Sequence, residues 1–111
     1  MTDFEMVRDM ALKLPDVKAT ESPRGLGLKV RGKLMACTAT HKSAEPNTLM
    51  VRVSVAEREK RIAEDPEVYY LTDHYRDYPA LLVRLTKINR KSLENLLGCS
   101  WQFIYEKSTA S

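Results

Sequence analysis

The period of the apolar residues changes from helical to strand-like within the first thirty positions. Over residues 3–14 the apolar side chains recur every three or four positions, which is typical of an amphipathic helix. Thr2 and Glu5 have the spacing of a capping box at its start. Pro15 should end the helix, because the residue before a proline disfavours helical backbone. We therefore expect a helix over 3–14 and a loop over 15–25.

From residue 26 the apolar residues alternate with polar ones, which predicts β-strands. Gly32 divides the first alternating stretch and suits a tight turn, because glycine accepts a positive φ. Residues 26–40 are therefore predicted to form a β-hairpin. Alternation predicts two further strands, over 49–53 and 81–85, and 68–72 is a candidate strand between them. A polar and aromatic loop is expected at 73–79, before the last strand.

Two more helices follow from capping signals. Ser54 and Glu57 form a second capping box that opens a helix over 55–64, which Asp65-Pro66 closes. Asn89 can cap the last helix. The apolar stripe of that helix comprises Leu93, Leu96, Leu97, Trp101 and Ile104.

This order, α-β-β-β-α-β-β-α, fits one domain over residues 1–111. Strands with one apolar and one polar face indicate a two-layer α+β fold, in which an antiparallel five-stranded sheet has helices on one face. The residues expected to face the helices are Leu28, Val30, Leu49, Val51, Leu81 and Val83. The opposite face should then carry Lys29, Arg31, Arg52 and Arg84.

Composition is that of an ordinary globular chain, with 43% hydrophobic and 30% charged residues. No apolar run approaches the roughly 18 residues needed to span a bilayer, and the acidic N-terminus lacks the apolar segment of a secretory signal. We therefore expect a cytoplasmic protein that does not interact with membranes. Cys37 and Cys99 are expected to be free and packed rather than disulfide-bonded.

The charge is unevenly distributed, although the net value is only +3. Residues 22–44 and 78–93 contain no acid, so the sheet face should be basic and could bind nucleic-acid phosphates. The candidate phosphate contacts are Lys29, Arg31, Arg52 and Arg84, with Arg24 and Lys33 at the rim. The alternative is a solvated face whose long basic side chains lie over Met35 and Met50.

The loop at 73–79 offers a second candidate contact. Tyr75 beside Arg76 could stack on bases. The alternative is that Tyr75 and Tyr78 brace the turn between two strands.

Catalytic and metal-binding patterns are weak. His41 and His74 lie in predicted loops, and no nucleophile with a positioned base can be identified. The alternative is that Cys37, as a thiolate near Arg52, is a reactive nucleophile. Two separate histidines and two distant cysteines do not make a zinc set, and no Gly-rich phosphate loop is present. We therefore expect neither an enzyme nor a cofactor.

The chain contains, in this order, the segments 12–17 (LKLPDV), 28–34 (LKVRGKL), 65–69 (DPEVY), 74–79 (HYRDYP) and 83–85 (VRL), followed by Trp101. Together they resemble the MmcQ/YjbR family of small bacterial proteins. The resemblance implies a two-layer fold with the element order given above, shared with type III secretion chaperones. The family is commonly labelled DNA-binding.

Charge and resemblance together predict a DNA-binding protein of low sequence specificity. The alternative is a non-enzymatic protein-interaction module or chaperone-like adaptor. That alternative would use Met35, Met50 and Leu82 as an apolar patch on the sheet.

Overall fold

The computed structural model describes residues 3–109, and side chains are described for residues 3–107. Within this part of the chain there are three α-helices and six β-strands. Their bounds in chain order are α1 Phe4–Ala11, β1 Val17–Ser22, β2 Gly25–Val30, β3 Lys33–Thr38, β4 Thr48–Arg52, α2 Val55–Glu64, β5 Tyr69–Tyr70, β6 Ala80–Arg84 and α3 Arg90–Thr109. A short 3-10 turn, Asp73–Tyr75, lies between β5 and β6.

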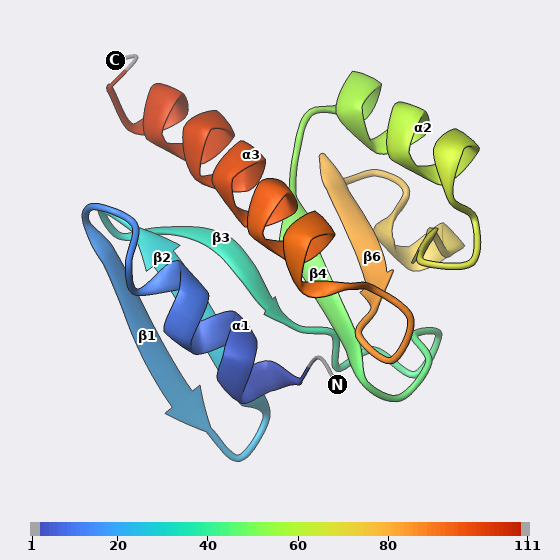
Figure 1. Cartoon of the computed structure of the whole chain (residues 1–111), viewed down its shortest axis with the longest axis horizontal. Coiled ribbons are helices and arrows are strands. Elements are labelled where there is room, and N and C mark those ends of the chain that lie inside the picture. Colours follow the sequence, from blue (N-terminus) through green and yellow to red (C-terminus); the bar gives the residue numbers. More distant parts are fainter. Residues whose placement is uncertain (1–2, 110–111) are drawn as a thin grey trace.

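The six strands form one sheet in the order β1-β2-β3-β4-β6-β5, and every neighbouring pair is antiparallel. Figure 1 shows α1 and α3 in front of this sheet, with α2 beside β6. The predicted two-layer α+β fold with an antiparallel sheet is confirmed. The sheet has six strands rather than the five that were predicted.

The additional strand, β1, lies in the segment 15–25 that was predicted to be a loop. Its six residues pair in register with β2, from Val17 opposite Val30 to Ser22 opposite Gly25. As an edge strand it places only two small apolar side chains, Val17 and Ala19, against the core. Its apolar alternation is therefore too weak to identify a strand, and the flanking prolines favoured a loop.

The predicted helix starts agree better with the structure than the predicted helix ends do. Thr2 lies outside the described residues, and the side chain of Asp3 caps α1 by accepting a hydrogen bond from the Met6 amide at 2.9 Å. The α1 helix ends at Ala11, three residues earlier than predicted. Ser54 caps α2, which has the predicted bounds, and Asn89 accepts from the Ser92 amide at 2.8 Å at the start of α3.

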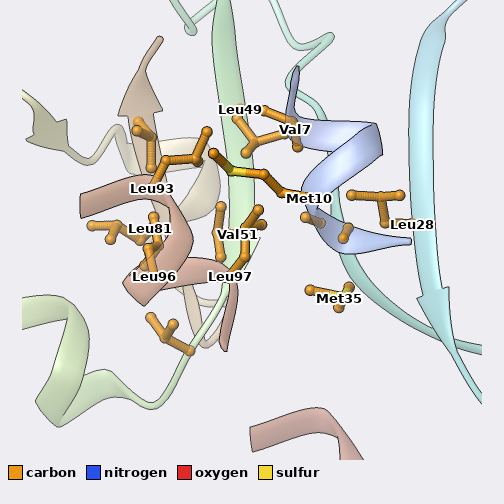
Figure 2. Packing of buried hydrophobic residues seen from close by; sticks show 14 of the residues in the cluster. Val7, Met10, Leu28, Met35, Leu49, Val51, Leu81, Leu93, Leu96 and Leu97 are labelled. Atoms are coloured by element: carbon orange, nitrogen blue, oxygen red, sulfur yellow. The ribbon is translucent and has the colours of Figure 1, made fainter. Parts of the chain in front are cut away.

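The main core lies between the sheet and the helices α1 and α3. Figure 2 shows Val7 and Met10 of α1 and three leucines of α3 directed at the sheet residues beneath them. All six apolar side chains predicted to face the helices are fully buried in this core, so the predicted strand parity is correct in β2, β4 and β6. They are Leu28, Val30, Leu49, Val51, Leu81 and Val83.

Strand β3 departs from simple alternation because it contains a β-bulge. Leu28 of β2 pairs with Ala36, but the next residue, Lys29, pairs with Leu34, so Met35 is the extra residue. Met35 and Ala36 are consequently both buried in the helix-side core. The prediction that Met35 lies on the opposite face is wrong, since a bulge turns two consecutive side chains to one side.

Strand bounds elsewhere differ by a few residues. Strands β4 and β6 each begin and end one residue before the predicted ranges. Strand β5 has two residues instead of the predicted 68–72. The loop that follows it therefore begins at Leu71 and is longer than expected.

Candidate functional site

The face of the sheet opposite α1 and α3, here called the open face, is divided into two parts. Over β4, β6 and β5 it carries a second, smaller apolar cluster formed by Met50, Ala80 and Leu82. We call this part the covered half. Strands β1 and β2 form the uncovered half, where the side chains on the open face are mainly small or basic. Leu34 at the start of β3 packs against the apolar cluster.

Two loops cover the apolar cluster. Ala44 from the loop at residues 39–47 and Tyr75 from the loop at residues 71–79 pack against it. Met50 is only 8% exposed and Leu82 is fully buried. The apolar patch expected for a protein-interaction module is therefore not exposed, because Met35 lies in the main core and the other two residues lie beneath these loops.

A stacked histidine pair joins the two loops. The rings of His41 and His74 lie 3.5 Å apart, centroid to centroid, with 6° between their planes, and Tyr75 meets both rings edge-on. The Ser43 hydroxyl lies 2.9 Å from that of Thr72. The Tyr75 hydroxyl also accepts a hydrogen bond from the His41 amide at 3.4 Å. Tyr75, a predicted base-stacking residue, thus braces the loops.

Arg84 lies on the open face as predicted, but its positive charge is paired with the carboxylate of Glu45. Its guanidinium makes three hydrogen bonds of 2.6–3.1 Å to the carboxylate of Glu45 and lies 4.2 Å from the centre of the Tyr70 ring. It also donates to the carbonyls of Pro66 and Glu67. The hydrogen bonds from Arg84 lower the pKa of Glu45, which keeps the pair ionised. Arg84 therefore belongs to the covered half and is not free to bind a phosphate.

The uncovered half presents two lysines in directly opposing positions. Lys18 of β1 pairs with Lys29 of β2, and both side chains are exposed. No ion pair to either lysine is found in the part of the chain that the structure describes. Their neighbours on this face toward the hairpin turn are Thr20 and Gly27.

Arg52 adds a third cation on the same face. It pairs with Ala80 at the start of β6. Its Nε is buried without a hydrogen-bond partner among the described residues, and it forms no ion pair within them. A buried guanidinium nitrogen that lacks an acceptor carries a desolvation cost.

Arg31 does not lie on the open face, contrary to the sequence interpretation, and Lys33, which was predicted at the rim of that face, contacts α3. The strand ends at Val30, and Arg31 takes a left-handed conformation (φ 51°) in the two-residue turn with Gly32. The Arg31 guanidinium lies 5.6 Å from the centre of the Tyr105 ring of α3. The Lys33 ammonium donates to the carbonyl of Lys107 at 3.5 Å. Both cations thus lie beside the C-terminal part of α3, where positive charge is favourable.

The two remaining predicted contacts lie apart from this group. Arg24 is exposed in the turn between β1 and β2, at the opposite end of that hairpin from Lys29. Arg76 is 64% exposed and forms an ion pair with Asp73 at 3.1 Å. The structure therefore brings together Lys29 and Arg52 of the eight predicted contacts. It adds Lys18, which was missed because its strand was predicted to be a loop.

Cys37 lies on the open face, as its position in the strand predicted, and packs against the covered cluster. Burial raises the pKa of its thiol, which disfavours the reactive thiolate. Among the described residues, no group of three or more His, Cys, Asp and Glu side chains is placed to hold a metal ion. Within the same residues, no helix combines the length and the apolar character needed to cross a membrane.

The other side of the molecule has a polar groove between α2 and α3, with a volume of about 700 Å³. Lysines and glutamates of both helices alternate along it. Arg61 at its floor is held by Glu57 at 2.7 Å and by Asn95 at 2.8 Å. Charges of both signs compensate each other there, in contrast to the uncovered half of the sheet.

Comparison with known proteins identifies a protein that shares the fold of this chain. No family model matches it. Over 40 residues the chain is 48% identical to uncharacterized proteins of Mycobacterium bovis and Mycobacterium tuberculosis, a match that covers 36% of this chain and only 31% of those proteins. A crystal structure of a Deinococcus radiodurans protein with a DUF419 domain is similar over 100% of this chain and 84% of its own, with a TM-score of 0.79 and 20% identity. This likeness shows that the two chains share a fold.

Proposed function

We propose that this protein binds the phosphate backbone of nucleic acids, with low sequence specificity, through the uncovered half of its open face and the adjoining Arg52 of β4. The observation that carries the proposal is the pair of lysines, Lys18 and Lys29, that oppose each other directly without a carboxylate between them. Like charges at directly opposed positions of an antiparallel sheet are destabilising. A bound anion would relieve this repulsion, and Arg52 provides a third contact on the same face.

Low specificity follows from the chemistry of the contacts. The ammonium groups of two lysines act as point charges, and contacts to phosphate fix position without reading sequence. Most of the affinity would arise from the release of counterions, so it should fall steeply as salt is added. A protein-interaction role through Met35, Met50 and Leu82 has no comparable support, because none of these side chains is exposed.

Membership of the MmcQ/YjbR family is part of the proposal. The resemblance in sequence supports it, and so does the likeness to a DUF419 domain, a family with this fold. The DNA-binding label of that family agrees with the proposed activity. The site proposed here rests instead on the positions and the charges of Lys18, Lys29 and Arg52.

The test is a titration of fluorescent oligonucleotides with wild-type protein and with the double variant Lys18→Gln/Lys29→Gln, at several salt concentrations. The wild type should bind a mixed-sequence duplex or the corresponding single strand at low salt. The double variant should bind more weakly. It should also change the dependence on salt. The slope of the logarithm of the association constant against the logarithm of the salt concentration should become shallower by about two, since each lysine accounts for about one phosphate contact.

The matched control is Lys60→Gln/Lys91→Gln, which removes the same charge from the groove between α2 and α3. It should retain most of the affinity. Equal weakening by both double variants would mean that only net charge matters and would refute the proposed site. Absence of any binding by the wild type at low salt would refute the proposed function.

A further inference from the structure

Lys18, Lys29 and Arg52, which form no ion pair with another described residue, belong to one row that crosses the sheet at right angles to its strands. Lys18 pairs with Lys29, and Lys29 pairs with Leu34. Next to them, Val51 pairs with Ala36, which brings Arg52 alongside the bulge in β3. Arg52 in turn pairs with Ala80 of β6. Adjacent strands lie about 4.8 Å apart, so the row runs for about 14 Å from β1 to β4.

An exposed aromatic ring lies at the β6 end of this row. Tyr78 is two residues before Ala80 and is 54% exposed. Its ring centre lies 6.3 Å from that of His74, whose ring contacts Tyr75 over the covered half. Tyr78 therefore lies at the edge of the open face, near the end of the second loop that covers the apolar cluster.

The backbone beneath this ring is firmly held. Arg58 of α2 is only 5% exposed and donates hydrogen bonds to the carbonyls of Tyr78 at 2.8 Å and Arg76 at 3.3 Å. The Ala80 amide also donates to the Tyr78 carbonyl at 2.8 Å. No hydrogen bond of the Tyr78 side chain is found among the described residues. The structure thus holds the main chain in place and leaves the ring at the surface.

We infer that the ligand is a single-stranded nucleic acid, which crosses the sheet along this row with its phosphates on Lys18, Lys29 and Arg52 and one base stacked on Tyr78. This inference rests on the proposed function. A phosphate row alone would accept either a duplex or a single strand. A tyrosine face at its end favours a single strand, because an unpaired base can lie on a side chain without the cost of opening a base pair.

The experiment compares wild type, Tyr78→Ala and Tyr78→Phe in binding to fluorescent DNA and RNA single strands and to a duplex of the same length. Wild type should bind the single strands more tightly than the duplex. Tyr78→Ala should weaken single-strand binding about fivefold or more, the cost of one lost stacking contact. Tyr78→Phe keeps the aromatic face and should bind like wild type. The DNA and RNA arms show which single strand is preferred.

Each result distinguishes the inference from the proposed function. If Lys18→Gln/Lys29→Gln weakens binding while Tyr78→Ala has no effect, phosphate binding stands and the inferred stacking is overturned. The same holds if Tyr78→Ala weakens duplex and single-strand binding equally. Because Tyr78 is exposed and its carbonyl makes the contacts to Arg58, the variant should remain folded, which its circular dichroism spectrum would verify.

Discussion

Lys18 and Lys29 repel each other across β1 and β2, so their sheet should gain stability when one of them is reversed in charge. Lys29→Glu would place opposite charges in the same opposed positions, an interaction worth roughly 0.2–1 kcal/mol in an antiparallel pair. We expect the urea midpoint of Lys29→Glu to rise at low salt while nucleic-acid binding falls. The gain should shrink at high salt, because exposed charges are screened.

A charge-swap series provides the control for this prediction. Lys18→Glu should stabilise the protein by a similar amount. The double variant Lys18→Glu/Lys29→Glu restores like charges and should lose the gain, as a double-mutant cycle would reveal. A midpoint that falls or stays unchanged in both single variants would contradict the account of this pair.

Individual residues also show which side-chain positions and partners could be predicted from the sequence and which could not. Lys29 and Arg52 were placed correctly because alternation holds within regular strands. Arg31 was misplaced because the strand ends one residue before it, in a turn with positive φ. Arg84 was placed on the correct face, but its partner Glu45 is 39 residues away in the sequence. Periodicity contains no information about such a distant ion pair.

At the level of elements, the bulge in β3 predicts different roles for two adjacent apolar residues. Met35 is fully buried in the main core, whereas Leu34 is half-buried on the open face. Met35→Ala should lower the free energy of unfolding by about 2–5 kcal/mol, the usual cost of truncating a large core side chain. Leu34→Ala should cost clearly less.

Urea unfolding of the two variants would measure the difference. Because the residues are adjacent and are changed to the same amino acid, each variant is the control for the other. If Leu34→Ala were the more destabilising change, β3 would alternate regularly and the bulge would be wrong. A regular strand is what the sequence predicted, because a continuous apolar run conceals a shift in register.

The two loops that cover the apolar cluster should respond to pH through His41. Desolvation lowers the pKa of this imidazole below its ordinary 6.5, and the nearby His74 and Lys42 lower it further. Its Nδ1 accepts a hydrogen bond from the Ser43 amide at 3.1 Å, which requires the unprotonated nitrogen. The ion pair of Asp73 with Arg76 in the facing loop supplies no net charge to offset protonation.

The sign of the pH effect follows from the depressed pKa. The unfolded chain takes up a proton as the pH falls below about 6.5, while folded His41 resists it, so stability is lost as the pH falls from that point. Urea midpoints measured between pH 8 and pH 5.5 should therefore decline in wild type. They should decline less in His41→Gln, which cannot titrate. A decline of equal size in both proteins would contradict this role for His41.

At the level of the whole molecule, the charge of the helices is compensated, whereas the charge of the uncovered half of the sheet is not. The seven acidic residues of the three helices, including Glu5 and Asp9 of α1 and Glu57 of α2, are matched by seven Lys and Arg residues in the same helices. The uncovered half of the sheet has cations without acid partners among the described residues. Such a distribution would orient an approaching polyanion toward the open face.

The overall fold could be predicted from the sequence because long helices and buried strands have strong periodic patterns. The position and order of the three helices and of the five strands from β2 to β6 followed from the sequence. The sixth strand, β1, could not be identified, since an edge strand buries little apolar surface. The division of the open face into two halves depends on how the loops at 39–47 and 71–79 fold over it, which local pattern does not determine.

The most direct test of the central claim is an NMR titration of isotope-labelled protein with a short single-stranded oligonucleotide at low salt. Our account predicts that amide shifts will concentrate at Lys18, Lys29, Leu34 and Arg52, continue to Tyr78, and disappear as salt is raised. Shifts concentrated in the groove between α2 and α3, or no shifts at low salt, would contradict it.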